Sequence, residues 1–271
     1  NNELTVDTNA LQSLQVPLVL FSISIGKIYN KNYKLVRRTD VMPDSTIKSL
    51  HEFSRLSLSR DKATYQHLNS LKVKNHKLGL CPTLFLNDYF EIPKNLSTIG
   101  KNDILLVIRN PELMNIPLES KPRVAKFIFD TYKKYKKQKK SIKIICNDTR
   151  DISFVNSLGI NEYIYTGVVE EYLARLKNAS LVISFRLHAS LPCFSFGTDC
   201  INLSYDERSQ SLMESIGLKN WDIPIFKYKN LDDITEKRIN NVNSFKSYSV
   251  NFHKNIKKYK KIQLDTLKIF K

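Results

Sequence analysis

The alternation of short apolar runs with helical segments between residues 104 and 218 most constrains what this chain can fold into. Apolar runs of strand length, each followed by a helical segment, stand at 104–108, 142–146, 163–165, 181–185 and 200–203. Strands that are separated by helices pair in parallel, because a crossover of that length returns the chain to the same edge of the sheet. The pattern predicts a mainly parallel sheet with right-handed crossovers.

A second, smaller α/β unit is predicted before this region. Strand-like runs stand at 16–25, 56–59 and 76–86, the last interrupted by Pro82, and helical segments stand at 47–55 and 62–72. Residues 90–103 are rich in Pro, Asn, Ser and Gly without periodicity, which indicates a linker. We therefore expect an N-terminal domain at 1–97 and a C-terminal domain at 98–228.

The C-terminal residues differ from both domains in composition and in the pattern of apolar residues. Beyond Trp221 the strand–helix alternation is expected to stop, and residues 229–271 are predicted to form a basic helical tail. Apolar side chains recur at helical spacing in this tail, at Phe245, Tyr248, Phe252, Ile256 and Tyr259. The spacing predicts a helix that packs across the domains with its lysines in solvent.

The charge balance points to an acidic partner. The 271 residues carry a formal net charge of +17, and the sequence pI is about 9.6. Nucleic acid, an anionic membrane surface or a phosphorylated substrate would each satisfy such a charge. The basic run at 133–140 continues an amphipathic helix, so a solvated face explains it better than a nucleic-acid patch, and we do not expect a nucleic-acid partner.

Several function classes lack sequence support. The four cysteines, at 81, 146, 193 and 200, form no CxxC pair, and buried thiols in a reducing compartment explain them best. Dinucleotide, P-loop and zincin motifs are missing, so we expect neither a cofactor nor a metal. No apolar run is long enough to span a bilayer, and no signal-peptide pattern opens the sequence. These features predict a cytoplasmic protein, with peripheral binding to a membrane as an alternative.

Three arginines stand at equivalent positions, directly after predicted strands. These are Arg60, Arg109 and Arg186, and His188 follows the last of them by two residues. In parallel sheets ligands bind outside the carboxyl ends of the strands, where guanidinium groups can hold a carboxylate or phosphate. The alternative for each arginine is an ion pair with a neighbouring carboxylate, for which Asp61 is a local candidate beside Arg60. His188 is either a proton-transfer group or a structural residue.

A second strand end adds two polar candidates. Tyr205 and Asp206 follow the apolar run at 200–203 and precede a helical segment. They could bind a hydroxylated substrate, but Asp206 is more simply explained as the cap of the next helix.

The motifs around these residues resemble those of the polysaccharide pyruvyl transferase family. The likeness is specific in Ser184-Phe185-Arg186-Leu187-His188-Ala189, which is followed by Phe196-Gly197, Ser204-Tyr205-Asp206 and Ile216-Gly217-Leu218. It extends to Ser57-Leu58-Ser59-Arg60-Asp61 and to Ile108-Arg109-Asn110-Pro111, and covers roughly residues 16–220. Two features depart from the family. The usual glycine-rich first strand is missing, and Cys81-Pro82 stands where an Asp-Pro pair is common.

The resemblance implies a GT-B-like architecture, in which two α/β domains with mainly parallel sheets face each other across a cleft, here with a reduced or truncated first domain. It implies transfer of the pyruvyl group of phosphoenolpyruvate to a sugar or lipid-linked glycan, giving a cyclic ketal. His188 and Arg186 would be the catalytic residues. The substrate-binding residues would be Arg60, Arg109, Ser184, Leu187, Tyr205 and Asp206.

Two other functions stay open at this point. A GT-B glycosyltransferase with a nucleotide-sugar donor would share the architecture and an arginine-lined site. A non-catalytic polyanion-binding protein would depend on the basic faces alone, and its affinity would fall steeply with salt.

Overall fold

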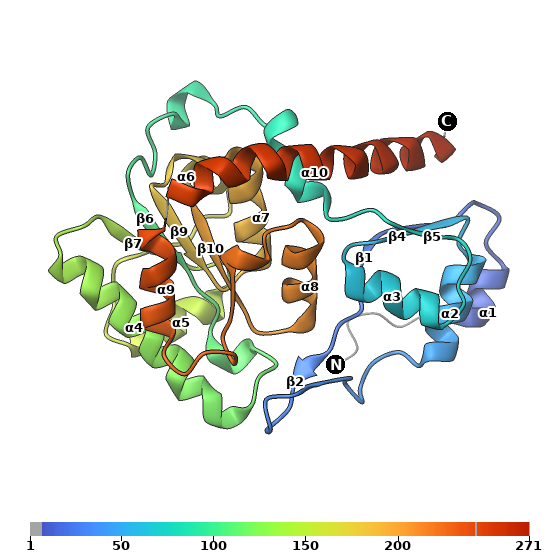
Figure 1. The fold of residues 1–271 in the computed structure, drawn as a ribbon, viewed down its shortest axis with the longest axis horizontal. Helices are drawn as coiled ribbons and strands as arrows, with labels where there is room; N and C mark the ends of the chain where they lie inside the picture. Colours follow the sequence, from blue (N-terminus) through green and yellow to red (C-terminus); the bar gives the residue numbers. More distant parts are fainter. Residues whose placement is uncertain (1–6, 242, 271) are drawn as a thin grey trace.

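The computed structural model of the chain describes residues 7–241 and 243–270, and it contains two α/β units (Figure 1). The first unit has a three-stranded parallel sheet in the order β1-β4-β5, formed by Val19–Ile23, Leu56–Ser59 and His76–Leu78. Helices α2 (Asp44–Phe53) and α3 (Lys62–Ser70) connect these strands, and α1 (Thr8–Gln12) precedes them. A short antiparallel hairpin, β2 (Ile28–Tyr29) and β3 (Leu35–Val36), extends from the unit.

The second unit has a six-stranded sheet in the order β11-β10-β9-β6-β7-β8, in which every pair is parallel. In chain order its strands are β6 (Ile104–Val107), β7 (Ile142–Ile145), β8 (Tyr163–Ile164), β9 (Leu181–Ser184), β10 (Cys200–Ser204) and β11 (Asp222–Pro224). The strand order reverses between β6 and β9, which are neighbours in the sheet but distant in sequence. A ligand crevice is expected at such a reversal. Two parallel α/β units confirm the predicted GT-B-like fold class.

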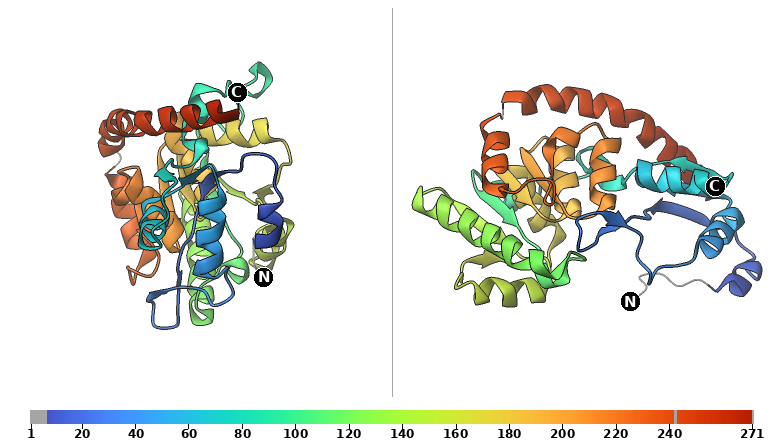
Figure 2. Two further views of the ribbon diagram at one scale, coloured as in Figure 1. Left: turned by 90° about the vertical axis from the view of Figure 1, so that its right-hand side faces the viewer. Right: turned by 60° about the horizontal axis from the view of Figure 1, so that its bottom comes forward.

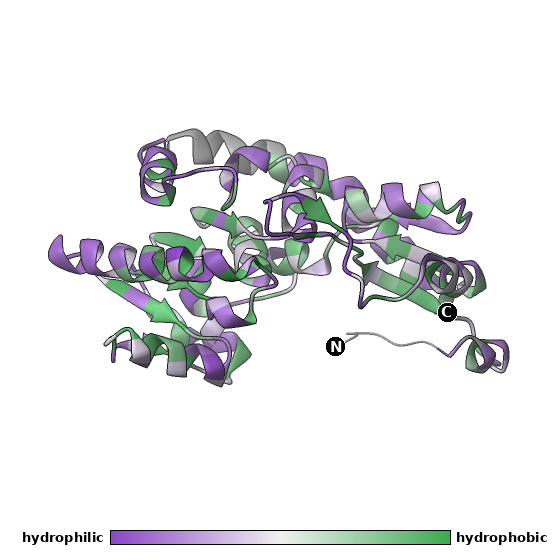
Figure 3. Cartoon of the chain, turned by 90° about the horizontal axis from the view of Figure 1, so that it is seen from below, coloured by the Kyte–Doolittle hydropathy of each residue, from purple (hydrophilic) through white to green (hydrophobic). Residues whose placement is uncertain are grey.

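Helices cover both faces of the six-stranded sheet. One face packs against α6 (Val169–Asn178), α7 (Leu187–Phe196) and α8 (Glu207–Ser215), whose apolar side chains form one core cluster with the strands. The other face packs against α4 (Lys121–Lys137), α5 (Thr149–Ser157) and α9 (Leu231–Asn240), which form a second cluster. Figure 3 shows hydrophobic strands between helices whose other faces are hydrophilic. Every residue of β6 and β9 is buried, as continuous apolar runs in a doubly covered sheet predict.

The structure corrects two expectations about strands. The strand predicted at 76–86 ends at Leu78, because Leu80 adopts a positive φ of 63° and Pro82 begins a 3₁₀ helix (Pro82–Asp88). The alternation also continues beyond Trp221, since β11 pairs in parallel with β10 at the sheet edge. This strand has three residues and ends in Pro224, which an edge strand tolerates because one side of it needs no partner.

Helix α10 (Asn243–Leu267) contacts both units. Phe252 and Ile256 are buried in the core cluster around α6, α7 and α8, and the Phe252 ring lies 6.4 Å from that of Phe194. Farther along, Gln263 Nε2 donates to the carbonyl of Gly79, directly after β5, at 2.7 Å. Figure 2 shows the helix running along both units. The side chains of the predicted tail residues Phe245 and Tyr248 lie outside the described residues.

The units also contact each other directly, beside the carboxyl ends of the strands. The Lys62 and Ala63 amides at the start of α3 donate to the hydroxyls of Ser215 and Ser211 on α8, at 2.9 and 2.7 Å. The β2–β3 hairpin reaches the second unit, where the Tyr29 ring lies 4.7 Å from that of Phe226. Strand ends from both sheets are therefore brought close to one another.

Candidate active site

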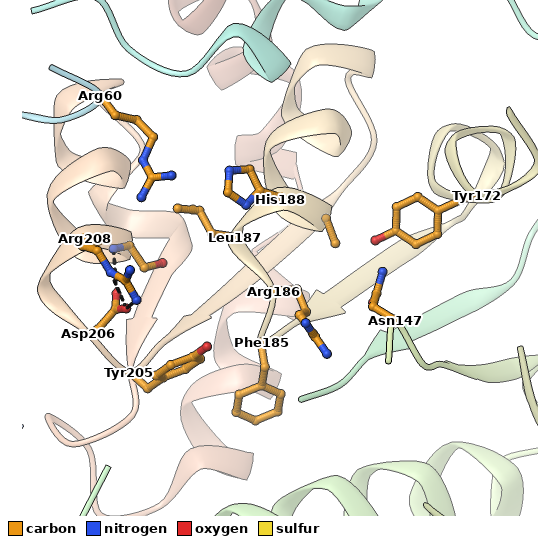
Figure 4. Close-up of a pocket in the computed structure, with 12 residues that line it drawn as sticks. Arg60, Asn147, Tyr172, Phe185, Arg186, Leu187, His188, Tyr205, Asp206 and Arg208 are labelled. Atoms are coloured by element: carbon orange, nitrogen blue, oxygen red, sulfur yellow. Dashed lines mark hydrogen bonds and ion pairs between the residues drawn. The ribbon is translucent and has the colours of Figure 1, made fainter. Parts of the chain in front are cut away.

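A cavity of about 540 Å³ lies at this junction, outside the carboxyl ends of the second sheet. Six of the eight predicted site residues line it: Arg60, Arg186, Leu187, His188, Tyr205 and Asp206. Arg60 comes from the end of β4 in the first unit, whereas the others come from the ends of β9 and β10 (Figure 4). The cavity is thus built from both units.

Arg186 is held by a buried carboxylate as well as facing the cavity. Its guanidinium forms an ion pair with Asp151 through Nη2, and its Nε donates to the Ile108 carbonyl at 3.0 Å. The Asp151 side chain is fully buried and also accepts from the amides of Asn110 at 2.8 Å and Asn147 at 3.2 Å. One carboxylate therefore joins the turns after β6, β7 and β9. The ion-pair alternative holds for Arg186, whose guanidinium shapes the site in addition to any contact with a ligand.

The structure corrects the placement of two predicted residues. Ser184 is completely buried and outside the cavity lining, where its hydroxyl accepts from the Arg186 amide at 3.0 Å and donates to the Arg186 carbonyl at 2.9 Å. Its hydroxyl holds the turn between β9 and α7. Arg109 follows β6 as predicted, but its side chain is also outside the lining, and its Nη2 donates to the Leu113 carbonyl at 3.4 Å. Hydrogen bonds within the turns, which the motif does not reveal, hold both side chains where they lie.

His188 faces Arg60 and Arg208 on the opposite side of the α7 start from Arg186 (Figure 4). The His188 side chain stays exposed to the cavity. Its pKa is lowered from the ordinary value, first by the desolvation that the surrounding walls impose and then by the charges of Arg60 and Arg208. The neutral imidazole is therefore favoured in the unliganded cavity.

Arg60 has no local carboxylate partner of the kind expected. The adjacent Asp61 is fully buried and caps α3, accepting from the Thr64 amide at 2.9 Å, and it also accepts from the Ser24 hydroxyl at 2.7 Å. The Arg60 Nε is buried and makes no hydrogen bond within the described residues. The side chain points into the cavity (Figure 4).

Asp206 and Arg208 form the opposite wall. Asp206 Oδ1 accepts from the Ser209 amide at 2.9 Å, which is the predicted helix cap, and Oδ2 accepts from the Arg208 Nε and Nη2 at 3.0 and 2.7 Å. Sequence reasoning missed Arg208. Its side chain passes over Gly26 of the first unit, where an added Cβ would lie 2.2 Å from the Arg208 Cγ. Arg208 also borders a smaller cavity of about 190 Å³ in the first unit.

Three further aromatic and amide groups complete the walls. Tyr205 lines the cavity, and burial raises its pKa while the charges of Arg109, Arg186 and Arg208 oppose that rise. Tyr172 and Asn147, which sequence reasoning missed, line the side nearest Arg186. Burial also raises the pKa of Tyr172. Hydroxyl and amide groups of this kind can bind a polar substrate.

A buried polar network lies behind the α8 wall. Asp222 on β11 accepts from Asn202 Nδ2 at 2.7 Å and from the Ser204 hydroxyl at 2.8 Å. Asn202 Nδ2 also donates to the hydroxyl of Ser209, which lines the cavity, at 3.0 Å. Burial raises the pKa of Asp222 to about 7, against the opposing hydrogen bonds. The network connects the edge strand to the helix that carries Arg208.

Within residues 7–241 and 243–270, no three His, Cys, Asp or Glu side chains gather closely enough to hold a metal ion. In the same residues, none of the helices combines the length and the apolar character that crossing a membrane requires.

Comparison with known proteins matches the chain to one family model. The family model described as polysaccharide pyruvyl transferase matches residues 9–207. No curated protein matches the sequence significantly.

Solved structures show only a distant likeness. UDP-GlcNAc 2-epimerase from Methanocaldococcus jannaschii is 14% identical with a TM-score of 0.45, and the match covers 60% of this chain and 49% of that one. A trehalose-6-phosphate synthase is 9% identical with a TM-score of 0.49, over 82% of this chain and 62% of that one. An accessory secretory protein structure from Streptococcus pneumoniae is 13% identical with a TM-score of 0.47, over 96% and 54%. The chain thus spans about half to three fifths of the length of these proteins.

Proposed function

The chain belongs to the polysaccharide pyruvyl transferase family, a family of transferases, and on that premise we propose that it transfers the pyruvyl group of phosphoenolpyruvate to two hydroxyls of a sugar. The product is a cyclic ketal, and the acceptor belongs to a surface polysaccharide or a lipid-linked glycan. The observation that carries this proposal is that Arg186, Leu187 and His188 line one cavity, which Arg60 enters from the other unit.

The charges of the cavity suit this donor. Phosphoenolpyruvate carries a carboxylate and a phosphate on adjacent positions, so a protein that binds it needs fixed cations at both groups. Arg60, Arg186 and Arg208 line the cavity, and guanidinium groups bind carboxylates and phosphates through paired hydrogen bonds. The volume of about 540 Å³ leaves room for a sugar ring beside the donor.

The reaction balances without a further reactant. A proton is added to the methylene carbon of the donor, and one sugar hydroxyl forms a bond to C2 while it loses its proton. The C2–O bond to phosphate then breaks, and the second hydroxyl forms its bond to C2. The two hydroxyl protons end on the new methyl group and on the released phosphate. Proton transfer to and from oxygen and carbon is the step at which the protein must act.

His188 is the residue that we assign to this proton transfer. Its imidazole is exposed to the cavity and lies beside the two arginines. A positioned general acid or base accelerates a reaction by about 10²–10⁴-fold. His188→Ala should therefore lower turnover by about two orders of magnitude, with donor affinity nearly unchanged.

The decisive experiment measures phosphate release from phosphoenolpyruvate with a panel of sugar acceptors. Release that requires an acceptor, together with a ketal in the product, supports the proposal. His188→Ala should abolish most of it, and His67→Gln serves as the matched control because His67 pairs with Asp44 outside the cavity. A His188→Ala protein with wild-type turnover would remove this residue from the mechanism.

A glycosyltransferase that uses a nucleotide sugar is the alternative, because an arginine-lined site between two α/β units also suits a diphosphate. The same assay with a panel of nucleotide sugars separates the two reactions. Turnover with a nucleotide sugar and none with phosphoenolpyruvate would replace the first proposal. Cytoplasmic localisation and contact with an anionic membrane surface stay predictions.

A further inference from the structure

The basic side chains of the cavity lie on opposite sides of the α7 start in Figure 4. Arg186 lies on the same side as Asn147 and Tyr172, whereas His188 faces Arg60 and Arg208. We propose that Arg60, Arg208 and His188 form a separate anion subsite that binds the phosphate of the donor. This inference rests on the proposed function, because it divides the donor between two subsites and leaves its carboxylate on the Arg186 side.

The strongest evidence is the state of Arg60. Its Nε is buried and makes no hydrogen bond among the described residues, although the side chain points into the cavity. Asp61 cannot serve as its partner because it is engaged by Thr64 and Ser24. A buried donor without an acceptor is unfavourable, and a ligand oxygen would satisfy it.

Two guanidinium groups lie near His188. The charged groups that act on His188 are Arg60 from the end of β4 and Arg208 from α8, and Asp206 at the end of β10 pairs with Arg208. Asp206 is the one carboxylate among these, and both of its oxygens already accept hydrogen bonds. Arg60 and Arg208 present two guanidinium groups to the same part of the cavity, and paired guanidinium groups suit a phosphate dianion.

By contrast, the charge of Arg186 already has a partner within the protein. The fully buried Asp151 forms an ion pair with the Arg186 guanidinium, and the Ile108 carbonyl accepts from its Nε. A singly charged carboxylate is therefore the better ligand for that side, and the doubly charged phosphate the better ligand for the other. The orientation of the donor follows from this difference.

Phosphate binding in this subsite has a consequence for His188. Desolvation and, after it, the charges of Arg60 and Arg208 lower the His188 pKa, and a bound dianion would oppose the effect of those charges. The imidazole should then gain a proton when phosphate binds. Binding of the donor would thereby protonate His188, which could then donate that proton to the methylene carbon of the donor.

The subsite also requires both units. Arg60 belongs to the first unit, and Arg208 reaches its position by packing over Gly26 of that unit. Neither unit alone presents Arg60, Arg208 and His188 together. The phosphate subsite therefore exists only while the units are in contact.

Calorimetric titration of the whole chain with inorganic phosphate tests the subsite without requiring turnover. Arg60→Gln and Arg208→Gln should each weaken phosphate binding about ten-fold or more, since each removes a charge-assisted contact. Arg150→Gln is the matched control, because that arginine is exposed, pairs with Asp148 and does not line the cavity. Arg208→Lys should recover part of the affinity by restoring the charge. Unchanged melting temperatures show that the variants are folded.

The His188 titration gives a second readout. NMR titration of the imidazole should show a higher pKa in the presence of inorganic phosphate, and this rise should disappear in Arg60→Gln. The inference is overturned if the wild-type protein does not bind phosphate, if Arg60→Gln and Arg208→Gln keep wild-type affinity, or if Arg150→Gln loses as much as they do. A further outcome separates the two proposals. If Arg60→Gln and Arg208→Gln lose phosphate binding but the wild-type protein shows no pyruvyl transfer, the subsite stands and the proposed function is refuted.

Discussion

Asp222→Asn should make the stability of the chain much less dependent on pH between pH 5 and pH 8. Asp222 is 4% exposed and accepts hydrogen bonds from Asn202 and Ser204 within a buried network. Burial is the main cause that raises its pKa from 3.8 to about 7, with a smaller contribution from the charge of Asp206. The folded protein therefore keeps a proton on Asp222 at pH values where the unfolded chain has lost it.

The sign of the effect follows from proton binding. Between the two pKa values the folded state binds more protons than the unfolded state, so stability falls as pH rises. The contribution is fully present below the unfolded pKa and is lost as pH rises through the folded pKa. Between pH 5 and pH 7 the loss is about two pH units at ~1.36 kcal/mol each, or roughly 3 kcal/mol, and little more is lost by pH 8.

Urea unfolding at pH 5, 6, 7 and 8 measures this loss. The difference between the wild-type protein and Asp222→Asn isolates the carboxyl group, because other groups that titrate in this range are the same in both. Buried His51, whose pKa is lowered to about 4, contributes in the opposite direction in both proteins. Parallel stability curves for the two proteins would refute the argument.

Three further substitutions test the site and the fold. Asp151→Asn should destabilise the protein by ~3–5 kcal/mol in urea unfolding, because it leaves the half-buried Arg186 guanidinium without its buried partner. Gly26→Ala should displace the Arg208 side chain and weaken inorganic phosphate binding about ten-fold, measured by calorimetry. Phe252→Ala should destabilise the fold by ~3–5 kcal/mol, because the ring is buried between α10 and the second unit.

Each of these has a control on the same chain. Glu162→Gln removes an exposed carboxylate that pairs with Lys136 and should change stability by less than ~0.5 kcal/mol. Gly167→Ala adds a Cβ with no neighbour within 4 Å and should leave phosphate affinity unchanged. Lys254→Ala changes an exposed position of α10, and its free energy of unfolding should equal that of the wild-type protein. If a control variant loses as much stability or phosphate affinity as the variant it is paired with, the corresponding prediction is wrong.

The sequence predicted the second unit well because its strands are buried on both faces. The runs that became β6 and β9 are continuously apolar and long enough to recognise, and the turns after them carry the arginine motifs. β11 escaped recognition because it has three residues and one proline, and its place depends on pairing with β10. The strand predicted at 76–86 was too long, because the positive φ at Leu80 and the 3₁₀ helix that begins at Pro82 end it after Leu78 despite the apolar residues that follow.

The site was predictable where a single strand end defines it, and not where the tertiary structure assembles it. Arg186 and His188 could be placed from the turn that they share. Asp151 lies at the start of a helix some 35 positions before its partner Arg186, and nothing in the local sequence connects the two. Arg208 gains its place in the cavity by packing over Gly26 of the other unit, a contact that no spacing in the sequence encodes.

The serine contacts at the start of α3 bear on how this protein could be recombined with its relatives. The first amides of a helix need acceptors from outside the helix, and here Ser211 and Ser215 of α8 supply them across the boundary between the units. A chimera joined in the linker at 90–103 would separate α3 from these hydroxyls unless the donor sequence kept them. A working exchange of the first unit should therefore also keep the face of α8 that carries Ser211 and Ser215, so the exchanged segment has to include more than the first sheet and its helices.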